Sequence, residues 1–271
     1  MGAILTNFLY QLLFTVGVIV VFGFIIALCR RGFCNLLGST GHKIILATGF
    51  IGTPIHELSH ALMCLIFGHK IVEIKLFQLH SNDGTLGYVN HSYNPKNIYH
   101  QIGNFFIGIA PIVFGCAFLL LFMWIFIPAT FASVFAQISS FRGSLADSSS
   151  LSQIFGLFGG ILSAIFNGAN LGNYLWWIYI VLALMISSHM ELSGADIKGS
   201  VVGLLVICGI YLVVDIIVGL ISQTALSAIT GVLASFGMTI ASFLLISVVF
   251  CLILIAIALI VKLISKLLFR R

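Results

Sequence analysis

The chain has 271 residues, of which 61% are hydrophobic and only 7% are charged. Charged residues make up about a quarter of a soluble domain, so this composition excludes a soluble globular protein and predicts an integral membrane protein. The net charge of +5 does not indicate binding to nucleic acid, because the basic residues lie at the ends of apolar segments, as membrane topology requires.

A helix needs about 20 apolar residues to cross the hydrocarbon core of a bilayer. We expect six such spans, near residues 8–29, 44–67, 103–127, 174–190, 200–222 and 237–262. Residues 154–169 are apolar and rich in glycine but short, so they predict a re-entrant or interfacial segment. The sequence therefore predicts an all-α polytopic membrane protein with about six transmembrane helices, in which residues 1–271 form a single transmembrane domain.

An HExxH motif, His56-Glu57-Leu58-Ser59-His60, lies in the second predicted span. Residues i and i+4 of a helix project from one face, so the two histidines can bind one metal ion. Glu57 then lies beside the open coordination position, where it can take a proton from water. The alternative is three polar residues hydrogen-bonded to neighbouring helices. A metal site is favoured, because polar side chains in a membrane are costly unless they are paired, metal-bound or in contact with water.

Residues 69–100 differ in character from the apolar segments around them. Residues 70–79 are rich in β-branched side chains and partly alternating, and residues 85–93 can pair with them across residues 81–84. Asp83-Gly84 between two such runs predicts a β-hairpin. The alternative is an amphipathic connector on the membrane surface. We expect a small hairpin directly after the helix that carries HExxH.

A catalytic zinc normally has three protein ligands, so the third must come from another part of the chain. Residues 187–199 hold the other cluster of candidate ligands, His189, Glu191 and Asp196. His189 lies two helical turns before Asp196 and could instead stabilise an oxyanion. Asp196 and Lys198 could also simply mark the end of a helix in water.

Over residues 44–200 the chain resembles the site-2 protease family of intramembrane zinc metalloproteases. That family carries HExxH on one core helix, a hairpin just after it, and a ligand aspartate on a later helix. Its aspartate usually lies in an Asn-x-x-Pro-x-x-x-Leu-Asp-Gly pattern. Here residues 192–199 keep an aspartate near a glycine, but the proline and the Leu-Asp-Gly triplet are missing. Residues 108–111 and Asn104 approximate the Gly-Pro and Asn of the family's intervening helix.

The resemblance implies that His56, His60 and Asp196 bind Zn²⁺ and that Glu57 is the general base. It also implies hydrolysis of peptide bonds in membrane-embedded or membrane-proximal protein substrates, within the lipid bilayer. Glu191 is the substitute third ligand if Asp196 does not bind.

Two other classes of function fit parts of the pattern. A metal-handling transporter also uses intramembrane histidines and carboxylates, but it does not explain the glutamate that directly follows His56. A catalytically inactive, protease-like scaffold fits the altered third-ligand pattern but not the intact HExxH. Asp215 is an intramembrane carboxylate that the HExxH motif does not require, so we do not assign it to the site.

The remaining histidines and the cysteines predict no further site. His80, His91 and His100 flank the expected hairpin and are too widely scattered in the sequence to predict a second metal centre. The six cysteines form no CxxC pair and are expected to be packing residues.

The positive-inside tendency places both termini in the cytoplasm if the chain crosses the membrane six times. Eight basic residues then lie inside and four outside, although Arg30 and Arg31 fall on the outer side. A full crossing by residues 154–169 would overturn this orientation. We expect a multi-pass protein of the cell membrane.

Overall fold

The structure is a computed structural model that describes residues 2–79, 84–144 and 151–268. These residues are almost entirely helical. In chain order the elements are α1 (Gly2–Leu12), the π-helix η1 (Leu13–Gly17), α2 (Val18–Leu37), α3 (Ser39–Ile66), β1 (Lys70–Lys75), β2 (Tyr88–Ser92), α4 (Ile98–Phe126), α5 (Pro128–Ser144), α6 (Leu151–Ile165), α7 (Gly168–Leu171), α8 (Tyr174–Ser187), α9 (Gly194–Ile221) and α10 (Gln223–Leu268).

Five helical stretches among the described residues are long and apolar enough to cross a membrane, by length and composition. A chain with several such helices is a polytopic membrane protein, so the predicted all-α membrane fold is confirmed. The stretches are Gly2–Leu37, Ile98–Phe126, Gln153–Leu171, Gly194–Ile221 and Gln223–Leu268.

These stretches differ from the six predicted spans at three places. Residues 44–67 form part of α3, which is not among the five, because the polar residues of HExxH lower its hydropathy. α8 has 14 residues, or about 21 Å at 1.5 Å per residue, against a hydrocarbon core of about 30 Å. Gln153–Leu171, predicted to be short, does reach spanning length. The cytoplasmic placement of both termini depended on six crossings, and the structure does not reproduce those six.

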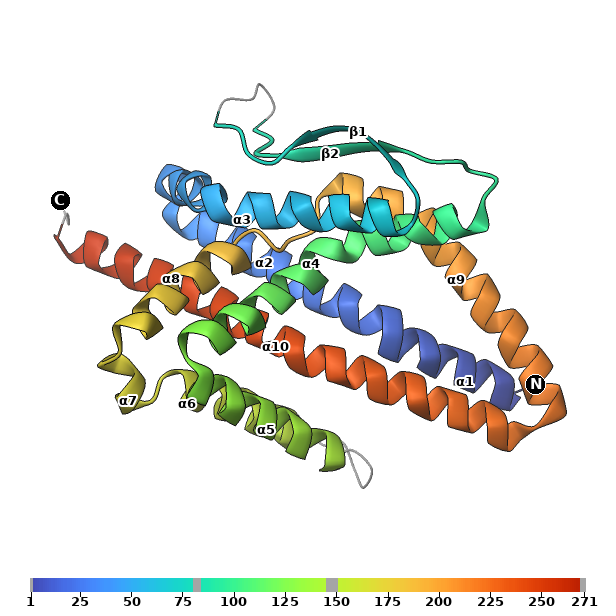
Figure 1. Ribbon diagram of the computed structural model, residues 1–271. Coiled ribbons are helices and arrows are strands. Elements are labelled where there is room, and N and C mark those ends of the chain that lie inside the picture. The colour runs from blue at the N-terminus through green and yellow to red at the C-terminus, as the bar shows by residue number, and fades with distance from the viewer. Residues whose placement is uncertain (1, 80–83, 145–150, 269–271) are drawn as a thin grey trace.

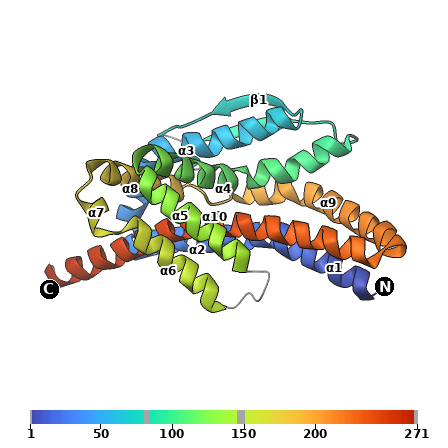
Figure 2. The same ribbon diagram turned by 60° about the horizontal axis from the view of Figure 1, so that its bottom comes forward.

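The helices form layers beneath the hairpin (Figures 1 and 2). The two strands run along one side of α3, and α4 lies on the other side of α3. The long helices α2 and α10 pack along one another beyond α4, and α5 pairs with α6 away from the hairpin. α9 begins beside α3 and α4 and leads away to its junction with α10. α3 therefore packs against the hairpin, α2, α4 and α8, with the start of α9 beside it.

The β-hairpin predicted after α3 is confirmed. β1 pairs antiparallel with β2, with Ile71 opposite His91 and Ile74 opposite Val89. Val72 lies at a bulge in this ladder and has no partner in the register. The turn predicted at residues 81–84 falls largely on residues 80–83, which lie outside the described residues.

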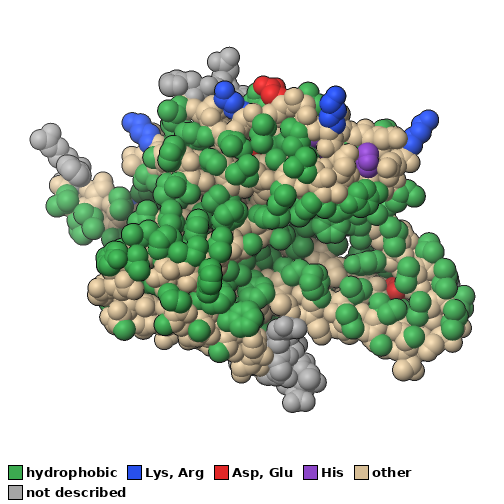
Figure 3. Space-filling model, viewed as in Figure 1, with side chains coloured by type: hydrophobic (Ala, Val, Ile, Leu, Met, Phe, Trp, Pro, Cys, Tyr) green, Lys and Arg blue, Asp and Glu red, His purple; other side chains and the backbone are tan. Residues whose placement is uncertain are grey.

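Charged side chains are unevenly distributed over the surface. On the face shown in Figure 3, Lys and Arg gather along the edge that carries the hairpin, and hydrophobic side chains cover most of the remainder. Basic side chains favour the membrane–water interface, and apolar ones the lipid. The hairpin edge is therefore the polar edge of this face.

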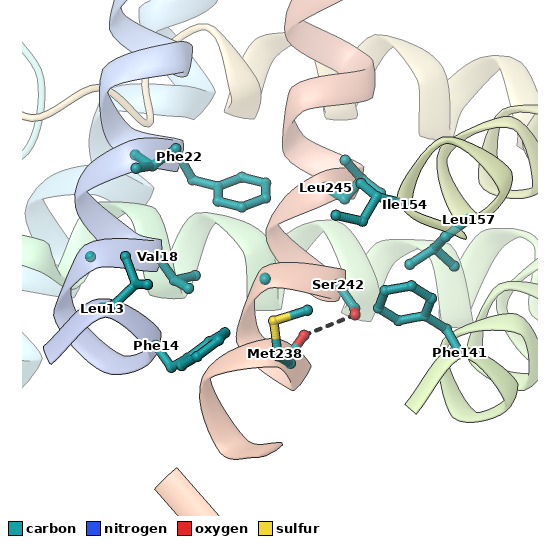
Figure 4. A pocket seen from close by; sticks show the side chains of 13 residues that line it. Leu13, Phe14, Val18, Phe22, Phe141, Ile154, Leu157, Met238, Ser242 and Leu245 are labelled. Carbon is teal, nitrogen blue, oxygen red and sulfur yellow. Dashed lines mark hydrogen bonds between the residues drawn. The ribbon is translucent and has the colours of Figure 1, made fainter. Parts of the chain in front are cut away.

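An apolar cavity of about 320 Å³ lies between η1, α2, α10 and the α5–α6 pair (Figure 4). One hydroxyl lines it, that of Ser242, which donates a hydrogen bond of 2.9 Å to the carbonyl oxygen of Met238. At Gly237 a Cβ would lie 1.6 Å from the carbonyl oxygen of Phe14, so α10 passes directly against η1 there. No candidate metal ligand lines this cavity, so it is separate from the HExxH site.

Asp215 takes part in a buried polar contact that joins three helices. The side-chain amide of Gln11 on α1 donates to Asp215 Oδ1 on α9 at 2.8 Å and to Thr230 Oγ1 on α10 at 3.0 Å. Asp215 is fully buried, and its Oδ2 has no hydrogen-bond partner among the described residues. This carboxylate thus serves as a helix–helix contact apart from the metal motif.

We expect Gln11→Met to lower the free energy of unfolding by about 1–2 kcal/mol, because it leaves a buried carboxylate without its donor at nearly unchanged volume. Thermal unfolding in detergent measures the effect. Thr6→Val, at an exposed position of α1, is the matched control and should leave the midpoint unchanged. Equal midpoints for both variants would contradict a stabilising role for this contact.

Candidate metal centre

The HExxH histidines lie one turn apart on α3 with their Nε2 atoms facing each other at 3.1 Å. His60 and Glu57 are each only 6% exposed. Burial of this kind is costly for polar side chains unless each atom has a partner. The partners of each imidazole nitrogen therefore show which nitrogens are already hydrogen-bonded and which are left to bind a metal.

Main-chain carbonyls orient both imidazole rings through Nδ1, the nitrogen that faces away from the other histidine. His56 Nδ1 lies 2.8 Å from the carbonyl oxygen of His189, and His60 Nδ1 lies 2.7 Å from that of Ile107. A carbonyl can only accept, so each Nδ1 carries the hydrogen, and in the neutral ring each Nε2 carries a lone pair. This tautomer, held by a hydrogen bond from the second nitrogen, is the one found in metal-binding histidines.

Asp196 of α9 completes the cluster. Its Oδ1 lies 3.3 Å from His60 Nε2, and its Oδ2 lies 3.9 Å from His56 Nε2. One ligand atom from each of the three residues lies within 4.8 Å of the others. Ligands at about 2.0–2.2 Å from a tetrahedral zinc are roughly 3.3 Å apart, so these spacings fit one ion. Two lone pairs and a carboxylate facing each other repel, and a shared cation removes that repulsion.

The first turn of α9 positions Asp196. The Ser193 main-chain N–H donates to Asp196 Oδ2 at 2.7 Å, and the Asp196 N–H donates to Ser193 Oγ at 3.1 Å, forming a capping box. At Gly108 on α4, a Cβ would lie 2.6 Å from the carbonyl oxygen of Asp196. Only glycine lets α4 approach so closely. Asp196 therefore caps the first turn of α9 and also faces both histidines.

The other two candidate ligands have different partners. Glu191 forms an ion pair with Arg30 of α2 and is not part of the cluster. The His189 ring faces α3, with Nε2 at 3.1 Å from both Thr48 Oγ1 and the Ile45 carbonyl oxygen. His189 thus contributes its carbonyl to His56 rather than its ring to the metal cluster.

A polar cavity of about 270 Å³ opens beside His56 and Glu57. Residues 84–87, which lead into β2, form one wall, and Arg30, Glu191 and Ser193 line the remainder together with Thr53 and His189. At Gly87 a Cβ would lie 2.8 Å from Glu57 Cγ, so the chain passes directly over the glutamate. A polar ligand in this cavity would contact the candidate base Glu57 and one candidate metal ligand, His56.

Three parts of this arrangement are absent from the sequence-based prediction. The carbonyls of Ile107 and His189 orient the histidines, and no sequence pattern identifies a carbonyl by its neighbour in space. Ser193 positions Asp196, and here a signal does exist, because Ser-x-x-Asp before an apolar run is a capping-box pattern.

No protein-family model, curated protein or solved structure matches this chain. The chemistry of the site therefore rests on its own residues and distances.

We expect Asp196→Asn to lower the zinc content by about one ion per chain, because the amide keeps the helix cap but lacks the anionic ligand. Mass-spectrometric metal analysis of detergent-purified protein measures this. Glu191→Gln, which disturbs only the pair with Arg30, is the control and should retain zinc. Loss of zinc in the control, and not in Asp196→Asn, would make Glu191 the third ligand.

Proposed function

We propose that this protein is an intramembrane zinc metalloprotease of the site-2 protease type, which hydrolyses peptide bonds in membrane-embedded or membrane-proximal protein substrates. The observation that carries the proposal is the convergence of His56, His60 and Asp196 beside a buried Glu57. The polar cavity next to them, bordered by the hairpin segment, supports access for a substrate.

Each group has a defined role in hydrolysis. His56, His60 and Asp196 would hold Zn²⁺, which would supply Lewis acidity toward the scissile carbonyl and the attacking water. Glu57 accepts the proton of the attacking water as its oxygen bonds to the carbonyl carbon. Glu57 then returns that proton to the amine nitrogen as the carbon–nitrogen bond breaks. The carbonyls of His189 and Ile107 keep the histidine rings in the ligating orientation throughout.

The hairpin is suited to holding the substrate. A transmembrane helix buries its carbonyls in its own hydrogen bonds, so the segment to be cleaved must first unwind. An unwound segment can pair with an exposed strand edge, which supplies main-chain hydrogen bonds in place of the lost ones. Residues 84–87 continue from β2 along the cavity, so a strand added to the hairpin would pass close to Glu57.

The membrane and its sides also belong to the proposal. We place the protein in the cell membrane with the hairpin on the cytoplasmic side. Lys70, Lys75 and Lys96 all lie in or beside the hairpin, and basic residues concentrate on the cytoplasmic side.

We expect Glu57→Gln to reduce hydrolysis by about 10²–10⁴-fold, because the general base is lost, while the zinc content stays the same. A mixture of fluorogenic single-span peptides in detergent serves as substrate, and metal analysis of the same samples gives the zinc content. Leu58→Ala, at an exposed neighbouring position, is the control.

Undiminished hydrolysis in Glu57→Gln would remove Glu57 as the base. Zinc binding without hydrolysis in the wild type would favour a metal-handling transporter. Absence of zinc at the HExxH site would favour an inactive scaffold.

We expect Ile74→Pro to lower cleavage of single-span substrates by about tenfold, equivalent to about 1.4 kcal/mol, because Ile74 pairs with Val89 and proline is unfavourable within a paired strand. Val72→Pro is the matched control, since Val72 has no partner in the register. Cleavage rates on the same peptides provide the measurement. Equal rates in the wild type and Ile74→Pro would mean that strand pairing does not hold the substrate.

A further inference from the structure

A second group of metal-ligating side chains lies at the C-terminal end of α3, one helical turn beyond His60. Cys64, in the last turn of α3, His69, just after the helix, and His91 on β2 each offer one ligand atom within 4.8 Å of the others. Cys64 is fully buried and His69 is 3% exposed, while His91 is half-buried. None of the three is a ligand in the HExxH cluster.

The end of α3 brings Cys64 and His69 together. The His69 N–H donates to the Cys64 carbonyl oxygen at 2.8 Å, and the Gly68 N–H donates to that of Leu65 at 3.2 Å. Gly68 has φ +69°, a left-handed conformation that favours glycine. These are the two hydrogen bonds of a Schellman motif, which folds the chain back so that the two side chains meet. The side-chain contact that accompanies this motif is usually between apolar residues, whereas here it is between the thiol of Cys64 and the imidazole of His69.

The hairpin ladder adds His91 to this pair. β1 begins at Lys70, directly after His69, and Ile71 lies opposite His91. His91 Nδ1 lies 3.0 Å from His69 Nδ1. The ring of Tyr93 stacks on His69, with centroids 4.9 Å apart and planes inclined by 14°. The three candidate ligands thus come from α3, from the turn after it and from β2.

The His69 ring has the same arrangement as the two HExxH rings. Its Nε2 lies 2.9 Å from the carbonyl oxygen of His100, which can only accept, so Nε2 carries the hydrogen. In the neutral ring, Nδ1 then directs its lone pair at His91. Burial lowers the pKa of both His69 and His91, which favours the neutral form that binds metals.

We propose that Cys64, His69 and His91 form a second metal site that binds Zn²⁺ and fastens β2 to the end of α3. One thiolate with two imidazoles is a donor set that zinc prefers. Two nitrogens at 3.0 Å are close to the roughly 3.3 Å between ligands of a tetrahedral zinc. Binding displaces the Cys64 proton to solvent. This site goes beyond the proposed proteolysis, since it holds whether or not the HExxH centre is catalytic.

The competing interpretation is a hydrogen bond from His91 Nδ1–H to His69 Nδ1, with Cys64 as a packing residue. Metal binding distinguishes these two interpretations, because a hydrogen-bonded pair alone would hold no ion. A signal from the thiol also separates this site from the HExxH cluster, which contains no sulfur. Of the two candidate metal clusters among the described residues, only this one contains a thiol, so a thiolate-to-cobalt charge-transfer band reports on this cluster and not on the HExxH cluster.

The test is Co²⁺ titration of the full-length protein in detergent, read by near-ultraviolet absorption and by metal analysis. We expect the wild type to show a thiolate-to-cobalt band. We expect Cys64→Ser to lose this band together with about one ion per chain. His56→Ala should retain the band, which separates this site from the proposed catalytic one. Cys116→Ser, at another buried cysteine, is the matched control and should also retain it.

A wild type without the band, or a band of equal strength in Cys64→Ser, would overturn the second site. If Cys64→Ser does not fold, His91→Gln at the half-buried strand position serves instead, and an unchanged band in that variant would overturn the proposal equally. Failure here would leave the Asp196 and Glu57 results unaffected, because those rest on other residues.

Discussion

Two imidazole-to-carbonyl hydrogen bonds hold α3 in place, and the arrangement of the site depends on them. His56 is bonded to the chain that follows α8, and His60 is bonded to α4. Both contacts require close packing of the helices. At Gly52, on the α8 side of α3, a Cβ would lie 2.5 Å from His189 Cδ2. A larger residue there would push α3 away from the carbonyl that orients His56.

The polar groups around α3 are arranged in a mostly apolar molecule, where each unmatched charge or lone pair is costly. Asp196 carries a negative charge and lies near two nitrogen lone pairs, while Glu191 is neutralised by Arg30. The two carboxylates therefore have different partners. Glu191 is paired with the guanidinium of Arg30, and Asp196 faces the two histidines. A divalent ion between His56, His60 and Asp196 would give the second carboxylate its matching charge.

α3 and the hairpin are linked at both ends of the site. Residues 84–87, before β2, cover Glu57, and His91, within β2, reaches the cluster formed by Cys64 and His69. Cys64 follows His60 by one helical turn, so candidate ligands continue along the same face of α3. The segment that borders the proposed catalytic cavity consequently leads directly into β2, the strand that the second site would anchor. With a metal at the second site, order in the hairpin would depend on side chains outside the proposed catalytic cluster.

The sequence by itself determined the membrane class, most of the helices, the hairpin and the HExxH pair. These follow from composition, apolar length and i, i+4 spacing, which are local properties of the chain. It also identified Asp196 as a candidate, although Glu191 and His189 could not be separated from it, because all three have suitable donors within a few residues.

Only the tertiary structure shows which of the three lies beside His56 and His60. The glycine contact between Gly108 and Asp196 and the ion pair between Arg30 and Glu191 act between segments far apart in sequence, whereas the capping box at Ser193 is local. The same reason explains why His91 seemed isolated in the sequence, since strand pairing and the turn at Gly68 bring it to Cys64. Local patterns fix which residues a helix presents, whereas the packing of helices fixes which of those residues meet.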